Sequence, residues 1–95
     1  MDMQKSVSGA QNAELAELTR QKIVVGAKQL RKSLKNGNAH RVYLACNADP
    51  AITEPIEALC QQYHVDLAWV RSMTDLGHAC GIEVGAAAAA AIKVN

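Results

Sequence analysis

Along most of the chain, segments whose apolar residues have the spacing typical of strands alternate with segments whose spacing is typical of helices. Ile-Val-Val at 23–25 is a short β-branched run that predicts a strand closed by Gly26. The nearly continuous apolar run at 41–46 predicts a central strand covered on both faces, and the alternation at 65–70 predicts a further strand. Apolar residues that recur three and four positions apart predict helices at 12–22, 27–36 and 56–63.

Turn and capping residues separate these elements. Gly37 follows the helix at 27–36 in the position where glycine commonly ends a helix, and residues 47–50 form a turn. Ser72, with Asp75 three residues later, is a capping box that predicts a short helix ending near Gly81.

The alanine-rich segment at 86–94 is ambiguous. Alanine favours a helix by intrinsic propensity. The preceding segments, however, predict three strands that alternate with helices, and a fourth strand here would complete their sheet. The alternation predicts an α/β sandwich with helices on both faces of a small sheet. Residues 1–11 lack periodicity and are expected to form a flexible tail, which leaves 12–95 as one domain.

Length and composition exclude several classes of protein. A chain of 95 residues with 49% apolar residues is expected to fold around one core. It has no apolar stretch long enough to span a membrane and no secretory signal, so a soluble, cytoplasmic protein without a membrane partner is expected. Its three cysteines are expected to be reduced thiols, and its three aromatic residues are too few for a base-stacking platform.

Charge is distributed unevenly along the chain, although the net charge is only +1. Between residues 20 and 41 there are seven cations and no acid, whereas residues 42–95 carry two cations and six acids. On a helix at 27–36 four of the cations fall on one side, opposite Leu30 and Leu34: Lys28, Arg31, Lys32 and Lys35. A polyanionic partner and an ordinary solvated face are both compatible with this basic segment.

Catalytic and metal-binding patterns find little support in the sequence. His40, His64 and His78 are scattered, and no nucleophile is paired with a base. His78 and Cys80 would point in different directions from one helix, and Cys80 is better interpreted as a small buried residue. We expect a protein that is not an enzyme and that has no metal or cofactor.

Binding chemistry is concentrated where a glycine opens a basic helix. Gly26 would allow a phosphate or base edge to approach the free N–H groups at the helix start. Lys28 and Lys32 would neutralise phosphates, and Gln29 would hydrogen-bond to a base edge. A second candidate is the 81–85 loop, whose apolar Ile82 and Val84 either fold inward or support a nucleotide turned out of its helix.

Four segments in the same order resemble the kink-turn-binding ribosomal protein family, which comprises an archaeal large-subunit protein, its eukaryotic ribosomal and nucleolar relatives, and a small bacterial branch. The resemblance covers about residues 16–94 and rests on GAKQLRK at 26–32, Ala-Asp-Pro at 48–50, LGHACG at 76–81 and IEVGAA at 82–87. It implies a three-layer α/β/α sandwich with a mixed four-stranded sheet, in which the alanine-rich segment is a strand. It also implies a monomer that binds structured RNA, namely a kink-turn in ribosomal or another RNA. A kink-turn is a duplex bent sharply at a bulge beside tandem G·A pairs.

The resemblance also assigns roles to particular residues. Gly26 would lie where the backbone comes closest to the RNA, Lys28 and Gln29 would reach guanine edges, and Lys32 would contact a base or phosphate. Arg31 is a further candidate for RNA contact or a solvated cation of the same helix. The loop formed by Ile82, Glu83 and Val84 would lie against the extruded bulge. Glu83 would repel phosphates unless its carboxylate accepts a hydrogen bond from a base or a 2′-hydroxyl.

Two positions depart from the archaeal pattern of the family. Lys28 replaces the usual Asn and Gln29 the usual Glu, as in the bacterial branch. A neutral amide oxygen is a weaker acceptor than a carboxylate, so RNA binding with lower affinity is expected. A protein-interaction module with the same fold and weak or no RNA binding is the alternative, because a fold does not fix a function.

Overall fold

The computed structural model describes residues 22–93, in which helices and strands alternate. The expected tail at 1–11, and the expected helix at 12–22 apart from Lys22, lie outside these residues. In chain order the elements are β1 (Ile23–Val25), α2 (Ala27–Lys35), β2 (Ala39–Ala45), α3 (Pro50–Tyr63), β3 (Asp66–Val70), α4 (Met73–Ala79) and β4 (Ala88–Ile92).

The strands form one mixed sheet in the order β1-β4-β2-β3. β2 and β3 are parallel, and β4 is antiparallel to both of its neighbours, so β1, β2 and β3 run in one direction and β4 in the other. The alanine-rich segment is therefore a strand, and its position between two others explains why helix propensity does not decide its structure. Backbone hydrogen bonds to both neighbours and complete burial of Ala88, Ala89, Ala90 and Ala91 stabilise the extended form.

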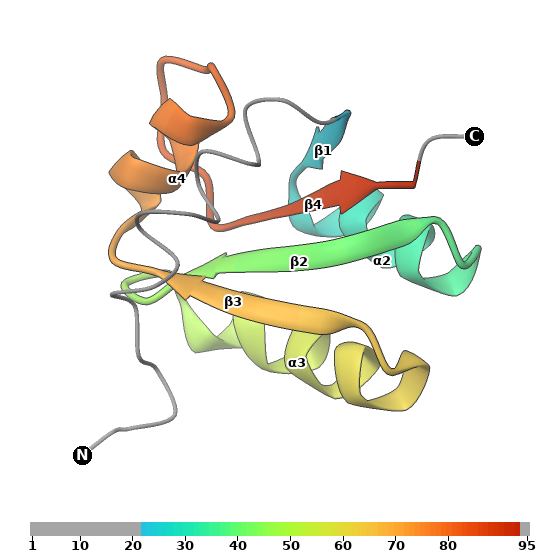
Figure 1. The fold of residues 1–95 in the computed structure, drawn as a ribbon. Helices are drawn as coiled ribbons and strands as arrows, with labels where there is room; N and C mark the ends of the chain where they lie inside the picture. The colour runs from blue at the N-terminus through green and yellow to red at the C-terminus, as the bar shows by residue number, and fades with distance from the viewer. Residues whose placement is uncertain (1–21, 94–95) are drawn as a thin grey trace.

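Two apolar clusters lie on opposite faces of the sheet. α2 and α3 lie side by side on one face, where Leu30, Leu34 and Ile56 pack against Val42 and Leu44. α4 lies on the other face, where Leu76 packs with side chains of the strands, including Tyr43. Figure 1 shows this arrangement, which confirms the three-layer α/β/α sandwich.

α2 ends as the glycine signal predicts. Asn36 is its C-cap, and Gly37 follows with a left-handed φ of 75°. The Gly37 N–H donates to the Leu34 carbonyl at 3.1 Å and the Asn38 N–H to the Ser33 carbonyl at 2.9 Å, which is the hydrogen-bond pattern of a Schellman motif. The expected helix at 27–36 is thus confirmed to within one residue.

Helix caps explain where α3 and α4 begin. α3 starts at Pro50, before the apolar repeat that begins at Ile56, because the Asp49 carboxylate accepts a hydrogen bond from the Ala51 N–H at 2.9 Å. The Ser72 hydroxyl caps α4 as predicted, accepting from the Asp75 N–H at 3.1 Å. No helix within residues 22–93 combines the length and apolarity needed to cross a membrane.

Candidate functional site

One end of the sheet collects the starts of the described helices. β1, β2 and β3 all finish there, so α2, α3 and α4 begin there, and β4 enters from the same end. The Gly26 N–H donates to the carbonyl of Ala88 at 3.0 Å, and the Ala45 N–H donates to that of Ala87 at 3.0 Å. The start of α2 and the chain leaving the 81–85 loop therefore lie at the same end, although 55 residues separate Gly26 from Gly81 in the sequence.

Gly26 is required by its own backbone conformation. It precedes α2 with φ 105° and ψ 144°, a combination that residues with a side chain rarely adopt. A Cβ built there would meet no heavy atom within 4 Å, so the side of Gly26 where a side chain would stand is open. The N–H groups of the first turn of a helix have no partner within the helix, so this open end is suited to an anionic or hydrogen-bond-accepting ligand.

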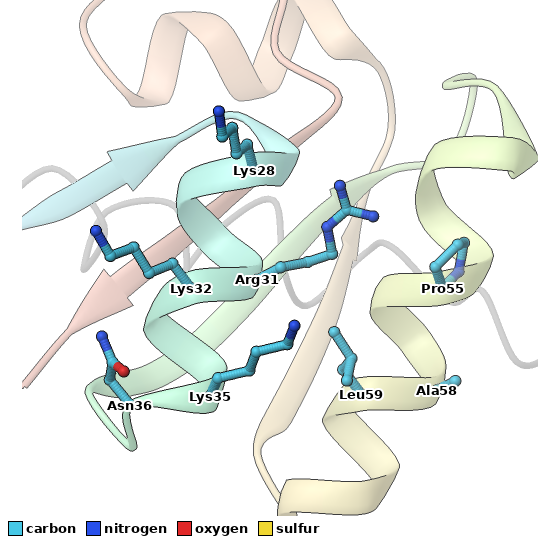
Figure 2. Close-up of a pocket in the computed structure, with 8 residues that line it drawn as sticks. All are labelled: Lys28, Arg31, Lys32, Lys35, Asn36, Pro55, Ala58 and Leu59. Carbon is cyan, nitrogen blue, oxygen red and sulfur yellow. The ribbon is translucent and has the colours of Figure 1, made fainter.

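The four cations of α2 are all exposed, while Leu30 and Leu34 on the opposite side are buried. The predicted amphipathic division of this helix is confirmed. Figure 2 shows that the cations separate further into two directions. Lys32 points away from α3, whereas Arg31 and Lys35 reach across toward it. Gln29, in the first turn, is also exposed.

The rest of the basic segment does not join this surface. Lys22 precedes β1 and Arg41 lies early in β2, so both are at the opposite end of the sheet. The Arg41 guanidinium lies 3.7 Å from the Asp66 carboxylate. Arg20, the remaining cation of the segment, lies outside the described residues. Among the cations of this segment that the structure describes, the fold separates those on α2 from Lys22 and Arg41.

The 81–85 loop places its two apolar side chains differently. Ile82 is half-buried and packs against the apolar cluster under α4, so the inward alternative holds for this residue. Val84 is 69% exposed, and Glu83 beside it is exposed as well. The inward alternative therefore does not hold for the Val84 side chain.

Two glycines hold this loop against α4, and the sequence reasoning assigned neither a role. A Cβ at Gly77 would clash with the backbone carbonyl of Val84, and one at Gly85 would lie 3.0 Å from the Cβ of Met73. The Ile82 N–H also donates to the Gly77 carbonyl at 3.0 Å. For Gly77 the sequence does carry a signal. Glycine inside a helix destabilises the helix by about 1 kcal/mol relative to alanine, so a glycine there indicates that a side chain would not fit.

Asn47, which the sequence predicts only as part of a turn, also positions α4. Its side-chain Oδ1 accepts a hydrogen bond from the backbone N–H of Met73 at 2.9 Å. This contact links the turn after β2 to the first residue of α4 across 26 positions of sequence. No local sequence pattern predicts such a contact, because the contact depends on β2 and β3 being neighbours in the sheet.

The Cys80 thiol, next to the 81–85 loop, is not activated. Burial raises the pKa of the Cys80 thiol to about 11, so it is protonated at neutral pH. His78 is exposed on α4. Among residues 22–93 no three His, Cys, Asp or Glu side chains come together in a group suited to a metal ion.

Fold and site together define a class: an α/β/α sandwich with a glycine-opened cationic helix beside an apolar loop. The chain belongs to the ribosomal protein L7Ae/L30e/S12e/Gadd45 family, whose model matches residues 9–95. This membership confirms the resemblance that the four sequence segments indicate.

Named relatives and a solved structure agree with this membership. An RNA-binding protein of Bacillus pumilus is 49% identical over 70 residues, which is 74% of this chain and 85% of that protein. The RNA-binding protein YbxF of Geobacillus stearothermophilus is 44% identical over 72 residues, which is 76% of this chain and 88% of that protein. The solved structure of the Giardia lamblia 15.5kD RNA binding protein superposes with a TM-score of 0.75 at 27% identity, covering 88% of this chain and 78% of that one.

Proposed function

We propose that this protein is a non-catalytic RNA-binding protein that recognises kink-turn RNA through the start of α2 and the 81–85 loop. The observation that carries the proposal is the open, positive-φ start of α2 at Gly26, followed directly by exposed cations. The RNA-binding relatives support the choice of ligand. In this proposal the protein acts as a cytoplasmic monomer in association with the ribosome or another ribonucleoprotein.

The helix start supplies the recognition of the bent duplex. An A-form major groove is too deep and narrow for side chains, so a protein reads it only where the duplex is distorted. Free N–H groups and the positive end of the helix dipole approach the RNA at Gly26. Lys28 and Lys32 neutralise phosphates, and Arg31 adds a third cation on the side of α2 that faces α3. The Gln29 amide reads a guanine edge, with one neutral acceptor in place of a carboxylate.

The 81–85 loop supplies the second contact. Val84 offers its exposed side chain to the face of a nucleotide extruded at the bulge, while Ile82 packs beneath and fixes the loop. The Glu83 carboxylate lies between them in sequence and is exposed. In this position it must accept a hydrogen bond from a base or a 2′-hydroxyl, because otherwise it would repel the phosphates.

The test is a binding comparison between a kink-turn duplex and a straight duplex of equal length. The substitutions Lys32→Ala and Gln29→Ala should each weaken binding to the kink-turn by about 1–3 kcal/mol, because each removes a contact made at the distorted groove. Lys93→Ala is the matched control, since this exposed lysine follows β4 at the opposite end of the sheet. Gel-shift titration of the purified variants measures all three effects.

Two results would contradict the proposal. Equal affinity for the kink-turn and the straight duplex would reduce the site to a nonspecific cationic patch. An absence of binding to either RNA would favour the alternative of a protein-interaction module with this fold.

A further inference from the structure

A groove between α2 and α3 extends from the start of α2 along its side (Figure 2). Its volume is about 690 Å³, which falls within the range of about 300–1,000 Å³ found for ligand sites. One wall is formed by α2 and the other by three apolar residues of α3. The lining residues are Lys28, Arg31, Lys32, Lys35, Asn36, Pro55, Ala58 and Leu59.

The two walls differ in chemistry. The α2 wall carries four cations and one amide, whereas the α3 wall is uncharged, and none of these lining residues is acidic. Figure 2 shows Arg31 and Lys35 reaching from α2 toward Leu59 and Pro55. A complementary ligand therefore combines a negative charge with a flat apolar surface, which is the composition of a nucleotide.

Pro55 is an unusual residue for the α3 wall. It lies inside α3, where proline removes a backbone hydrogen bond and destabilises the helix. Its side chain is exposed, so burial in the core does not offset this cost. Its ring, together with half-buried Leu59, gives the groove a rigid apolar surface opposite the planar guanidinium of Arg31.

We propose that this groove holds a nucleotide of a single-stranded segment that flanks the RNA bound at the start of α2. The base lies between the Arg31 guanidinium and the Pro55–Leu59 surface, and the phosphate lies against Lys35. This inference rests on the proposed function, because the same strand must first be anchored at Gly26. Lys28 and Lys32 belong both to that anchor and to the groove lining, so the two surfaces are continuous.

Continuity also decides between RNA and an acidic protein segment, which would match the same charges. A strand leaving the start of α2 passes cations along the whole helix, from Lys28 in the first turn to Lys35 at its last residue. At a rise of 1.5 Å per residue this path is about 10 Å long, within the reach of a short single-stranded extension. A protein segment would have to displace or adjoin that strand.

The experiment compares a blunt kink-turn with the same kink-turn carrying a short single-stranded extension, placed in turn on each strand. For the wild-type protein, one of the extensions should raise affinity about tenfold, because the groove then holds one more base and its phosphate. Ala58→Glu places a carboxylate in the groove without removing a core contact, because Ala58 is exposed. This variant should lose the gain from the extension while binding the blunt RNA normally.

Matched controls separate a groove effect from a general change of charge. Gln61→Glu changes the charge equally at an exposed position of α3 that does not line the groove, and it should keep the gain. Lys35→Ala should lose most of the gain, whereas Lys93→Ala should keep it.

The possible failures are distinguishable. A wild-type protein that does not bind the blunt kink-turn rejects the proposed function and this inference with it. Normal binding to the blunt RNA with no gain from either extension, or an equal gain in Ala58→Glu and Gln61→Glu, overturns the groove proposal alone. In that case, binding of an acidic, leucine-containing peptide that Ala58→Glu abolishes would assign the groove to a protein partner.

Discussion

At the scale of single residues, glycines at one end of the sheet are required for different physical reasons. Gly26 has open space where a Cβ would stand, and its positive φ of 105° is what excludes other residues. Gly77 lies within α4, and there the Val84 carbonyl excludes a side chain. The first reason can be inferred from a glycine between a strand and a helix, whereas the second depends on a contact that only the folded chain makes.

Two thiols show how burial sets chemistry at the same scale. Burial, with a smaller contribution from the Glu57 carboxylate, raises the pKa of Cys60 from 9.0 to about 11. Burial alone raises the pKa of Cys80 to about 11. Because the thiolate is the nucleophile, neither cysteine is a reactive group near pH 7. Cys60 is buried, whereas Cys80, which was predicted to be buried, is only half-buried.

These pKa values predict a pH dependence of stability on the alkaline side. Below about pH 9 the thiols are protonated in both the folded and the unfolded chain, so they contribute no pH dependence. As the pH rises from 9 through about 11, the unfolded chain loses these protons first, and the free energy of unfolding falls. Urea unfolding of the wild type and of Cys80→Ala at about pH 8 and about pH 10.5 should show a smaller loss of stability for the variant. An identical loss in both proteins would contradict the raised pKa of Cys80.

At the scale of elements, α4 and the 81–85 loop act as one unit. The Ile82 N–H donates to the Gly77 carbonyl and the Ala86 N–H to the Met73 carbonyl, so each end of the loop is bound to α4. Asn47 in turn holds the start of α4 through its bond to the Met73 N–H. The exposed position of Val84 therefore depends on the close approach of α4 at Gly77.

The substitution Gly77→Ala tests this coupling. Its Cβ must push the Val84 carbonyl away, so the loop should shift while α2 keeps its structure. We expect about a tenfold loss of kink-turn affinity, comparable to losing one good contact. NMR amide shifts should change at 81–85 and stay unchanged at 26–32, and Thr74→Ala, an exposed position of α4, serves as the control. Normal affinity with a displaced loop would remove the loop from the interface.

Sequence patterns predicted those elements whose signals are local. The start of α2, its end at Gly37 and the cap at Ser72 each depend on neighbouring residues, and the structure confirms all three. The first part of α3 was missed because its start is set by Asp49 and Pro50 rather than by apolar periodicity. The alanine-rich strand could not be assigned from its own residues, because alanine favours a helix and only the two neighbouring strands make the extended form stable.

At the scale of the whole molecule, the fold decides which cations act together. β1 runs toward the site, α2 runs back from it and β2 returns, so the residues before β1 and at the start of β2 lie far from Gly26. Lys22 and Arg41 are close to α2 in sequence but belong to the other end of the sheet. Proximity in sequence therefore does not show which cations act together: of the six described cations between residues 22 and 41, four lie on α2 and two lie at the other end of the sheet.

This division limits how steeply RNA binding depends on salt. Each neutralised phosphate lowers the logarithm of the binding constant by about 0.7–0.9 per unit of log salt concentration. If each of the four cations of α2 neutralises one phosphate, the slope for a kink-turn is about −3 to −4, and Lys28→Ala should reduce its magnitude by about one. Lys22→Ala should leave the slope unchanged, because Lys22 lies at the opposite end of the sheet. A slope near −6 that Lys22→Ala reduces would instead require RNA to contact both ends of the sheet at once, and the site at Gly26 would then be only part of a larger interface.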